Sequence, residues 1–331
     1  MKATVVGSGN MGTALASLLA INGRQVTCWD HAPEVVEDIR RNHENRRSLP
    51  GVRLPDNVTA ELLLSQAVRD ARTIIVAVPS PFFRHVVKEF SPFAASNAVV
   101  IGCAKGLEAH SGKRMSQVYA ESSTHDADQY VALSGPSVAT EFVWGKPTAV
   151  ALAGVHPPCI QKAVQVLTTS FFHVEATDDV AGVEWGGVLK NIYAIGMGFL
   201  DGLSPGSVNL KAAFLEMALR EMKHVGVKLG ARAETFEGLA GLGDLVTTGF
   251  SPDSHNRRLG ESLAMGKKFE DALDHMGCGL PEGVKSSAIL ADLIAQKKLS
   301  APIALKIDAC IKHPAGIHRF LEDIWKSPAI H

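Results

Sequence analysis

Residues 3–12 read Ala3-Thr4-Val5-Val6-Gly7-Ser8-Gly9-Asn10-Met11-Gly12 and lead into the apolar segment 13–21. This G-x-G-x-x-G pattern lies between a predicted strand and a predicted helix, which is the context that makes it informative. Gly7 permits a tight turn, Gly9 lets the backbone approach a pyrophosphate, and Gly12 lets the helix pack on the strand. The helix start offers N–H groups and a positive dipole end to an anion. The stretch predicts a dinucleotide-binding unit, and a glycine turn without a ligand is the alternative.

The first 180 residues alternate short β-branched runs with helix-like stretches, which is typical of a parallel sheet covered by helices on both faces. The predicted strands are 3–6, 25–29, 73–78, 99–103, 130–133, 148–153 and 172–174. The predicted helices are 11–21, 33–42, 81–93, 114–121 and 157–169. Residues 44–57, which are rich in arginine and asparagine and contain two prolines, are predicted to form a surface loop.

Beyond residue 180 the β-rich runs give way to apolar periods near 3.6 residues, which indicate helices. The predicted helices there are 181–200, 208–228, 258–275, 283–297 and 302–312. The sequence therefore predicts an α/β protein. Domain 1–180 is expected to be a Rossmann-like doubly wound sheet that binds a dinucleotide, and domain 181–331 is expected to be an all-α domain that holds the substrate and the catalytic groups.

Composition excludes several classes of protein. The chain has 331 residues, 46% of them hydrophobic and 20% charged, which fits two folded domains. The formal net charge of −1 provides no overall basic field for nucleic acid or an anionic membrane. The cysteines lack the paired spacings of zinc or redox motifs, so we expect reduced thiols and no metal site. They are Cys28, Cys103, Cys159, Cys278 and Cys310.

Targeting and membrane segments are not expected. The strand-like run at 3–6 leaves no room for a cleavable signal peptide in front of it. The most apolar runs, 73–78 and 192–200, are shorter than the roughly 18–20 residues that span a bilayer. We therefore expect a cytoplasmic protein without a membrane anchor.

The second predicted strand ends at Asp30, where a carboxylate can accept hydrogen bonds from the adenosine ribose of a dinucleotide. The same charge would repel a 2′-phosphate. Asp30 therefore favours NAD and disfavours NADP as the cofactor. The alternative is that Asp30 only caps the helix that begins near Pro33.

Lys190 and Asn191 stand in a nearly all-apolar helical stretch of the second domain. Desolvation of a buried ammonium group lowers its pKa toward neutrality. Such a lysine facing a nicotinamide cofactor is a general acid for carbonyl reduction near pH 7. The alternative is a lysine whose amine extends along the helix to solvent.

Four further segments place charged or polar residues among glycines or before a helix. Any one of them could be a simple turn. They are Cys103-Ala104-Lys105-Gly106-Leu107-Glu108, Ser134-Gly135-Pro136-Ser137, Gly241-Leu242-Gly243-Asp244-Leu245 and Ser254-His255-Asn256-Arg257-Arg258.

Taken together and in order, these motifs resemble the NAD-dependent glycerol-3-phosphate dehydrogenases, which interconvert dihydroxyacetone phosphate and sn-glycerol 3-phosphate. The resemblance covers nearly the whole chain. It runs through GSGNMGTALA at 7, AKGLE at 104, SGPSVATE at 134, GGVLKNIYAIGMG at 186, GLAGLGDLVTT at 238, NRRLG at 256 and PEG at 281. The family has a Rossmann domain followed by an all-helical domain, in agreement with the pattern above.

The resemblance also implies roles for particular residues. Lys190 matches the family's catalytic lysine, Lys105 a substrate-binding lysine of the same site, and Asp244 the aspartate that orients the substrate region. The implied catalytic residues are thus Lys190, Lys105 and Asp244. The implied substrate-binding residues are Lys105, Gly135, Ser137, Lys190, Asp244, Ser254, His255, Asn256 and Arg257. The implied cofactor-binding residues are Gly7, Gly9, Asn10, Met11, Gly12, Asp30, His31, Lys105, Ala139, His255 and Glu282.

The chain departs from the family pattern at His255, where the family usually has an arginine that helps neutralise phosphate. A histidine is charged for only part of the time at pH 7 and lacks the planar fork of a guanidinium. Either phosphate affinity is weaker here, or Arg257 or Arg258 supplies the missing charge.

Electrostatics around Lys190 are expected to act in both directions. Lys105 would lower the pKa of Lys190 by repulsion between like charges, whereas Asp244 within reach would raise it. The sequence alone does not decide between the two effects.

Three functional hypotheses follow. The first is a cytoplasmic enzyme that makes sn-glycerol 3-phosphate from dihydroxyacetone phosphate with NADH for glycerophospholipid synthesis, with Lys190 as general acid and base. It would bind a small-molecule substrate, and neither nucleic acid nor a membrane; a homodimer is compatible with it. The second is a related two-domain NAD-dependent dehydrogenase acting on a different small hydroxy acid. The third is a sensor or scaffold that binds NAD(H) without turnover.

Overall fold

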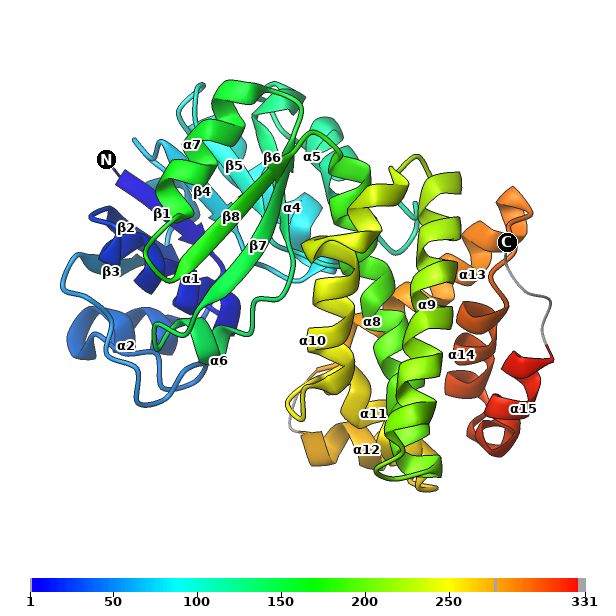
Figure 1. Cartoon of the computed structure of the whole chain (residues 1–331). Helices are drawn as coiled ribbons and strands as arrows, with labels where there is room; N and C mark the ends of the chain where they lie inside the picture. Colours follow the sequence, from blue (N-terminus) through cyan, green and yellow to red (C-terminus); the bar gives the residue numbers. More distant parts are fainter. Residues whose placement is uncertain (1, 277–278, 327–331) are drawn as a thin grey trace. The chain divides into compact units, whose positions relative to one another are not determined.

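A computed structural model describes residues 2–276 and 279–326 of the chain (Figure 1). The described chain forms two compact units. The first contains the residues up to Ala104 together with Arg114–Val183, and the second contains Lys105–Lys113 together with the chain from Glu184 onward. The two domains expected from the sequence divide at 180/181, close to the break at Val183. The sequence did not indicate that Lys105–Lys113 groups with the second unit.

An eight-stranded sheet forms the centre of the first unit. Its strands are β1 (Lys2–Val6), β2 (Gln25–Trp29), β3 (Val58–Glu61), β4 (Thr73–Val76), β5 (Val99–Gly102), β6 (Tyr130–Ser134), β7 (Thr148–Gly154) and β8 (Phe172–Thr177). The strand order is β3-β2-β1-β4-β5-β6-β7-β8. Successive strands are added on one side of β1 up to β3 and on its other side from β4 onward, so the topological switch point lies between β1 and β4. The first six strands follow the doubly wound order, which confirms the predicted fold class.

Helices cover both faces of this sheet. They are α1 (Asn10–Ile21), α2 (Pro33–Asn42), α3 (Leu64–Ala67), α4 (Ser80–Phe90), α5 (Met115–Ser122), α6 (Ala139–Phe142) and α7 (Pro157–Leu167). On one side α1 packs with α6 and α7, and on the other α4 packs with α3 and α5. Strands β4 and β5 are buried along their whole length, as expected for strands covered on both faces.

The sheet differs from the expected one in two respects. One is that β7 runs antiparallel to β6, whereas a parallel sheet is expected from the sequence. A parallel neighbour needs a crossover, usually a long helix, and the connection here contains only the four-residue α6. The other is that the edge strand β3 was missed, because four residues that alternate buried and exposed carry little pattern.

Residues 44–57 are not a plain surface loop, which corrects the prediction. Asn45, Leu49, Val52 and Leu54 are buried in the first unit, while the arginines of the segment remain exposed. Leu54 donates its backbone N–H to the carbonyl of His43, and Glu44 pairs with Arg53 in an isolated β-bridge. The apolar residues are spaced too irregularly to fit either a helical or a strand period.

The second unit is helical. Its helices are α8 (Val180–Leu203, which starts in the first unit), α9 (Val208–Lys228), α10 (Asp244–Phe250), α11 (His255–Ala264), α12 (Phe269–Met276), α13 (Glu282–Lys297), α14 (Pro302–Lys312) and α15 (Phe320–Trp325). The single helix predicted over 258–275 is two helices, α11 and α12. Every residue of α8 from Gly182 to Leu200 is buried, so α8 is the centre of this unit.

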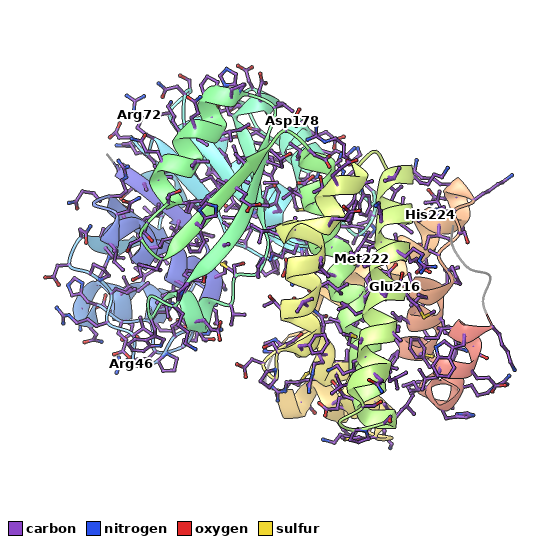
Figure 2. All side chains as sticks on the ribbon, in the orientation of Figure 1. Arg46, Arg72, Asp178, Glu216, Met222 and His224 are labelled. Atoms are coloured by element: carbon purple, nitrogen blue, oxygen red, sulfur yellow. The ribbon has the colours of Figure 1, made fainter. Side chains whose placement is uncertain are left out.

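Charged side chains such as Arg46, Arg72 and Glu216 lie exposed on the surface of their own unit (Figure 2). Cys28, Cys103, Cys159 and Cys310 are reduced cysteines outside any disulfide, in agreement with the expectation, and Cys278 lies outside the described residues. Within the described ranges, no helix is both long and apolar enough to cross a bilayer, and no group of three or more histidine, cysteine, aspartate or glutamate side chains could hold a metal ion.

Candidate active site

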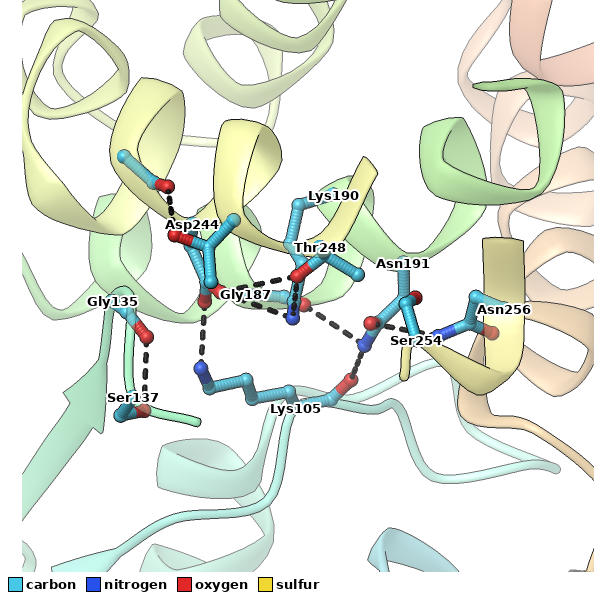
Figure 3. A network of polar contacts seen from close by, with 12 residues as sticks. Lys105, Gly135, Ser137, Gly187, Lys190, Asn191, Asp244, Thr248, Ser254 and Asn256 are labelled. Carbon is cyan, nitrogen blue, oxygen red and sulfur yellow. Dashed lines mark hydrogen bonds and ion pairs between the residues drawn. The ribbon is translucent and has the colours of Figure 1, made fainter. Parts of the chain in front are cut away.

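Two lysines and one aspartate meet in the second unit, and we refer to Lys105, Lys190 and Asp244 as the lysine–aspartate cluster (Figure 3). Lys105 Nζ lies 2.6 Å from Asp244 Oδ2, and Lys190 Nζ lies 3.0 Å from Asp244 Oδ1. Lys190 Nζ also donates a hydrogen bond to Thr248 Oγ1 at 2.6 Å. The Asp244 carboxylate therefore bridges the two ammonium groups.

Three separate pieces of chain supply this cluster. Lys190 lies in the middle of α8, Lys105 follows β5, and Asp244 is the first residue of α10, directly after a π-helical turn at Leu239–Gly243. That turn lies against α8 at Gly186, where an added Cβ would be 2.2 Å from the carbonyl oxygen of Ala240. Because Gly186 is one helical turn before Lys190, its missing side chain lets Asp244 approach the lysine.

The cluster is buried. Asp244 is 2% exposed and Lys190 is 7% exposed, while the side chain of Lys105 retains 15% exposure. Two positive charges share one negative charge, so the three side chains carry a formal charge of +1 in a poorly solvated place. Such a site favours an anion or a developing negative charge beside it.

Burial, more than any neighbouring charge, sets the pKa of Lys190. Desolvation lowers this pKa from 10.5 to about 8; Asp244 acts in the opposite direction, and repulsion from Lys105 adds to the lowering. The sequence left open whether Lys105 or Asp244 dominates the pKa of Lys190, and the structure shows that burial outweighs both. Burial alone would raise the pKa of Asp244, but attraction to Lys105 and Lys190 outweighs it and holds that pKa below its ordinary value.

Two asparagines hold the cluster's surroundings in place. Asn191 Nδ2 donates to the carbonyl oxygens of Lys105 (3.1 Å) and Gly187 (3.2 Å). Asn256 Nδ2 donates to Asn191 Oδ1 at 2.9 Å, and Asn256 Oδ1 accepts the N–H of Gly283 at 3.0 Å. This hydrogen-bond chain joins α8 to the Lys105 segment and to α11 (Figure 3), and through Gly283 it also reaches the start of α13.

The polar residues at 254–258 have different structural roles. Ser254 caps α11 by accepting the N–H of Arg257 at 3.3 Å. His255 is exposed at the first position of α11, and partial burial together with Arg258 lowers its pKa. His255 is therefore mostly neutral at pH 7 and carries little of the charge that an arginine would have.

Arg257 is not directed toward the lysine–aspartate cluster. Its Nε lies 2.9 Å from Asp201 Oδ2 and its Nη1 lies 3.0 Å from Glu261 Oε2. Asp201 is about three turns along α8 from Lys190, a separation of roughly 16 Å. These two ion pairs hold the Arg257 guanidinium within the second unit, and its contact with substrate stays a prediction.

In the first unit, the glycine turn has the form that the motif predicts. Gly7 has φ +99°, and a Cβ on Gly12 would lie 1.8 Å from the carbonyl oxygen of Gly7, so only glycine allows α1 to pack there. No neighbouring atom lies within 4 Å of the place where a Cβ on Gly9 would sit. Gly9 and Asn10 are exposed and Met11 is partly buried at the start of α1, which leaves space for an anion at the helix start.

Asp30 has two structural hydrogen bonds. Its Oδ2 accepts the N–H of Ser8 at 3.0 Å and its Oδ1 accepts the N–H of Ala32 at 3.0 Å. The exposed side chain of His31 lies beside it, with Nδ1 3.3 Å from Oδ1. Each carboxylate oxygen retains a lone pair, so these contacts are compatible with a ribose contact as well.

The remaining candidate residues lie at turns and helix starts. Gly135 has φ +115°, Ser137 Oγ donates to the carbonyl of Gly135 at 3.0 Å, and Ala139 begins α6 in the first unit. Glu282 begins α13 in the second unit. Sequence reasoning missed Thr248, because nothing in the local sequence marks the threonine as a partner of Lys190. Asn191 could have been noticed as the second polar residue of an apolar helix.

Comparison with known proteins gives a consistent result for both parts of the chain. Residues 2–158 match the family described as NAD-dependent glycerol-3-phosphate dehydrogenase N-terminus, and residues 179–322 match its C-terminus. The glycerol-3-phosphate dehydrogenase [NAD(P)+] of Carboxydothermus hydrogenoformans is 38% identical over 303 residues, which is 92% of this chain and 90% of the relative. The glycerol-3-phosphate dehydrogenase [NAD(P)+] of Pelotomaculum thermopropionicum is 39% identical over 307 residues, which is 92% of this chain and 87% of the relative.

Solved structures agree with these relatives. The glycerol-3-phosphate dehydrogenase of Coxiella burnetii has a TM-score of 0.91 at 30% identity and covers 98% of this chain and 99% of its own. The glycerol-3-phosphate dehydrogenase of Saccharomyces cerevisiae has a TM-score of 0.86 at 26% identity, and the match covers 98% of this chain and 99% of the yeast chain. A ketopantoate reductase of Ralstonia eutropha, at 15% identity and a TM-score of 0.57, shares only the fold. The comparisons therefore do not favour the alternative of a different hydroxy acid.

Proposed function

Because the chain belongs to the family of NAD-dependent glycerol-3-phosphate dehydrogenases, we propose that it reduces dihydroxyacetone phosphate reversibly to sn-glycerol 3-phosphate. The observation that carries this proposal is the buried lysine–aspartate cluster, with a lysine whose pKa is about 8. A scaffold that only binds a dinucleotide has no need to bury two ammonium groups around one carboxylate.

NAD supplies or accepts the hydride when it is bound. Lys190 acts as the general acid during reduction, because negative charge develops on the substrate oxygen as the ketone becomes an alcohol. A pKa of about 8 leaves the amine mostly protonated at pH 7 and still able to release its proton. In the oxidative direction the neutral amine of Lys190 takes the proton from the alcohol.

Lys105 and Asp244 complete the catalytic set. Asp244 orients both amines through its two carboxylate oxygens, at 2.6 and 3.0 Å. Lys105 stabilises the anionic substrate by its charge, and the cluster's net charge of +1 suits a phosphorylated ketone. We assign further substrate contacts to Gly135, Ser137, Ser254, His255 and Asn256, and cofactor contacts to Gly7, Gly9, Asn10, Met11, Gly12, Asp30, His31, Lys105, Ala139, His255 and Glu282.

The mostly neutral His255 leaves a charge to be supplied for the substrate phosphate. Arg257 is occupied by Asp201 and Glu261, so we assign this task to Lys105 and, among the arginines of α11, to Arg258. An arginine at position 255 would add a permanent charge to this set, so His255→Arg should lower the KM for dihydroxyacetone phosphate.

We also propose that the cofactor is NAD in preference to NADP, because Asp30 places a carboxylate next to the turn and would repel a 2′-phosphate. A cytoplasmic location and a role in supplying glycerol 3-phosphate for glycerophospholipid synthesis follow from the same proposal. Whether the chain forms a homodimer is checked by sedimentation of the purified protein.

Initial rates test the proposal. Wild type and His255→Arg are assayed with dihydroxyacetone phosphate, with NADH and NADPH in turn, and with several 2- and 3-keto acids as competing substrates. We expect turnover with dihydroxyacetone phosphate and NADH far above all other combinations. Reduction of a keto acid at a higher kcat/KM would support the second hypothesis, and NADH binding without reduction of any ketone would support the third.

A further inference from the structure

Asn45 is an amide side chain buried completely in the first unit, although it belongs to the segment 44–57 outside the glycine motif. Its Nδ2 donates to the carbonyl oxygen of Ser8 at 2.7 Å and to Thr13 Oγ1 at 2.8 Å. Its Oδ1 accepts the N–H of Ser48 at 3.3 Å. A buried amide is retained only where its donors and acceptor find partners, and here they do.

The carbonyl of Ser8 is the point on which this network converges. Besides the Asn45 amide, it accepts hydrogen bonds from Thr13 Oγ1 and from Ser48 Oγ, each at 3.1 Å. The other side of the residue is held too, because the N–H of Ser8 donates to Asp30 Oδ2 at 3.0 Å. Ser8 is only 2% exposed, so these partners fix the peptide that links it to Gly9.

The orientation of that peptide matters for the turn's chemistry. In a planar trans peptide the C=O and the following N–H point in opposite directions. A Ser8 carbonyl that is held toward the interior therefore turns the N–H of Gly9 outward, at the exposed start of α1. If the peptide flipped, a carbonyl oxygen would face an incoming phosphate and repel it.

We infer that Asn45 is a positioning residue for the dinucleotide: it holds the Ser8–Gly9 peptide so that the Gly9 N–H faces the pyrophosphate. This inference rests on the proposed function, since it concerns how the cofactor of that reaction is held. Asn45 has no contact of its own with the cofactor in this scheme and acts through Ser8.

A matched control exists in the same part of the chain. Asn57 also donates twice from Nδ2, to the carbonyls of Ala20 (2.9 Å) and Arg24 (2.7 Å). These acceptors lie at the far end of α1, away from the turn. Asn45 and Asn57 thus tie opposite ends of the same helix to the chain that follows α2.

The test compares Asn45→Ala, Asn57→Ala and the milder Ser48→Ala with the wild-type chain. NADH affinity is measured by nicotinamide fluorescence, folding by thermal unfolding, and the reaction by kcat and by KM for each substrate. We expect Asn45→Ala to raise the Kd and the KM for NADH about tenfold, on the scale of one lost hydrogen bond. The KM for dihydroxyacetone phosphate and the kcat at saturating NADH should change less than about twofold. Asn57→Ala should lower stability and leave the Kd unchanged, and Ser48→Ala should raise the Kd by about twofold to fivefold.

Several outcomes overturn the inference. One is a folded Asn45→Ala variant that binds NADH as tightly as Asn57→Ala does. If Asn45→Ala does not fold, an unchanged Kd in Ser48→Ala overturns it instead. A wild-type chain that binds no NADH would contradict the proposed function, and this outcome is distinct from wild-type binding that is insensitive to Asn45 and Ser48.

Discussion

Replacing Lys190 with methionine should make the chain more stable at neutral pH while it lowers turnover by orders of magnitude. Lys190 is buried and its pKa is about 8 instead of 10.5. Each pKa unit corresponds to about 1.4 kcal/mol, so the charged amine costs the folded state about 3 kcal/mol relative to the unfolded chain. This cost already includes the attraction to Asp244, because that attraction contributes to the pKa. Methionine has a similar length and no charge to desolvate.

The gain in stability should depend on pH in a defined way. Below pH 8 the lysine is protonated in both the folded and the unfolded chain, so the folded state bears the full cost. Between about pH 8 and 10.5 the folded chain releases the proton before the unfolded chain does, and the cost shrinks. The difference in the free energy of unfolding between Lys190→Met and wild type should therefore be largest below pH 8 and decline toward pH 10.

Urea unfolding at pH 7 and pH 9.5, followed by circular dichroism, measures this difference. We expect Lys190→Met to gain between about 1 and 3 kcal/mol at pH 7, which is several degrees in Tm, and clearly less at pH 9.5. The control is Lys211→Met, which removes an amine 3.0 Å from Asp201 and should lose about 1 kcal/mol. A loss of stability at pH 7 in Lys190→Met, comparable to that of Lys211→Met, would refute the argument that the buried amine is costly.

Three further predictions concern the reaction and its cofactor. Lys190→Ala should lose on the order of 10²–10⁴ in turnover with NADH binding retained, and unchanged turnover would remove Lys190 from the mechanism. The kcat/KM for ketone reduction should fall as pH rises through about 8, because the Lys190 amine must carry a proton. The kcat/KM for alcohol oxidation should rise over the same range, because that direction needs the neutral amine. The same pH profile in both directions would contradict the role of Lys190 as acid and base. Asp30→Asn should raise kcat/KM with NADPH relative to NADH at least about tenfold, since it removes a charge that repels the 2′-phosphate. The kcat/KM with NADH should itself fall, because the amide has one acceptor oxygen where the carboxylate accepts the N–H groups of both Ser8 and Ala32. An equal loss with both cofactors would show that Asp30 acts only through these two bonds.

Much of the fold could be read from the sequence, because its signals are local. The run at 3–12 defines a strand, a turn and a helix by residue type alone, and the structure has all three. The apolar helix around Lys190 was predicted from its composition, and α8 is indeed buried along this stretch. Elements with few residues or mixed patterns, such as β3 and α6, carry too little signal for such a reading.

The candidate site depends on contacts that the sequence does not contain. The meeting of Lys105 with Asp244, 139 residues apart, was expected only through the family resemblance. The ion pair between Arg257 and Asp201 could not be foreseen either, because Asp201 comes from another helix. Asn45 was assigned to a surface loop because nothing local shows that Ser8 and Thr13 surround it.

The membership of Lys105–Lys113 in the second unit has a practical consequence for anyone who divides this protein. The polypeptide passes from one unit to the other at 104/105, at 113/114 and at 183/184, so no single cut yields two complete pieces. A fragment that ends at residue 180 would carry Lys105 without its carboxylate, and the complementary fragment would leave Asp244 with one amine fewer to balance it. Isolated fragments are therefore unsuitable for measuring either binding or stability. When the two fragments are mixed, the lysine–aspartate cluster should form again only if residues 105–113 of the first fragment pack on the second.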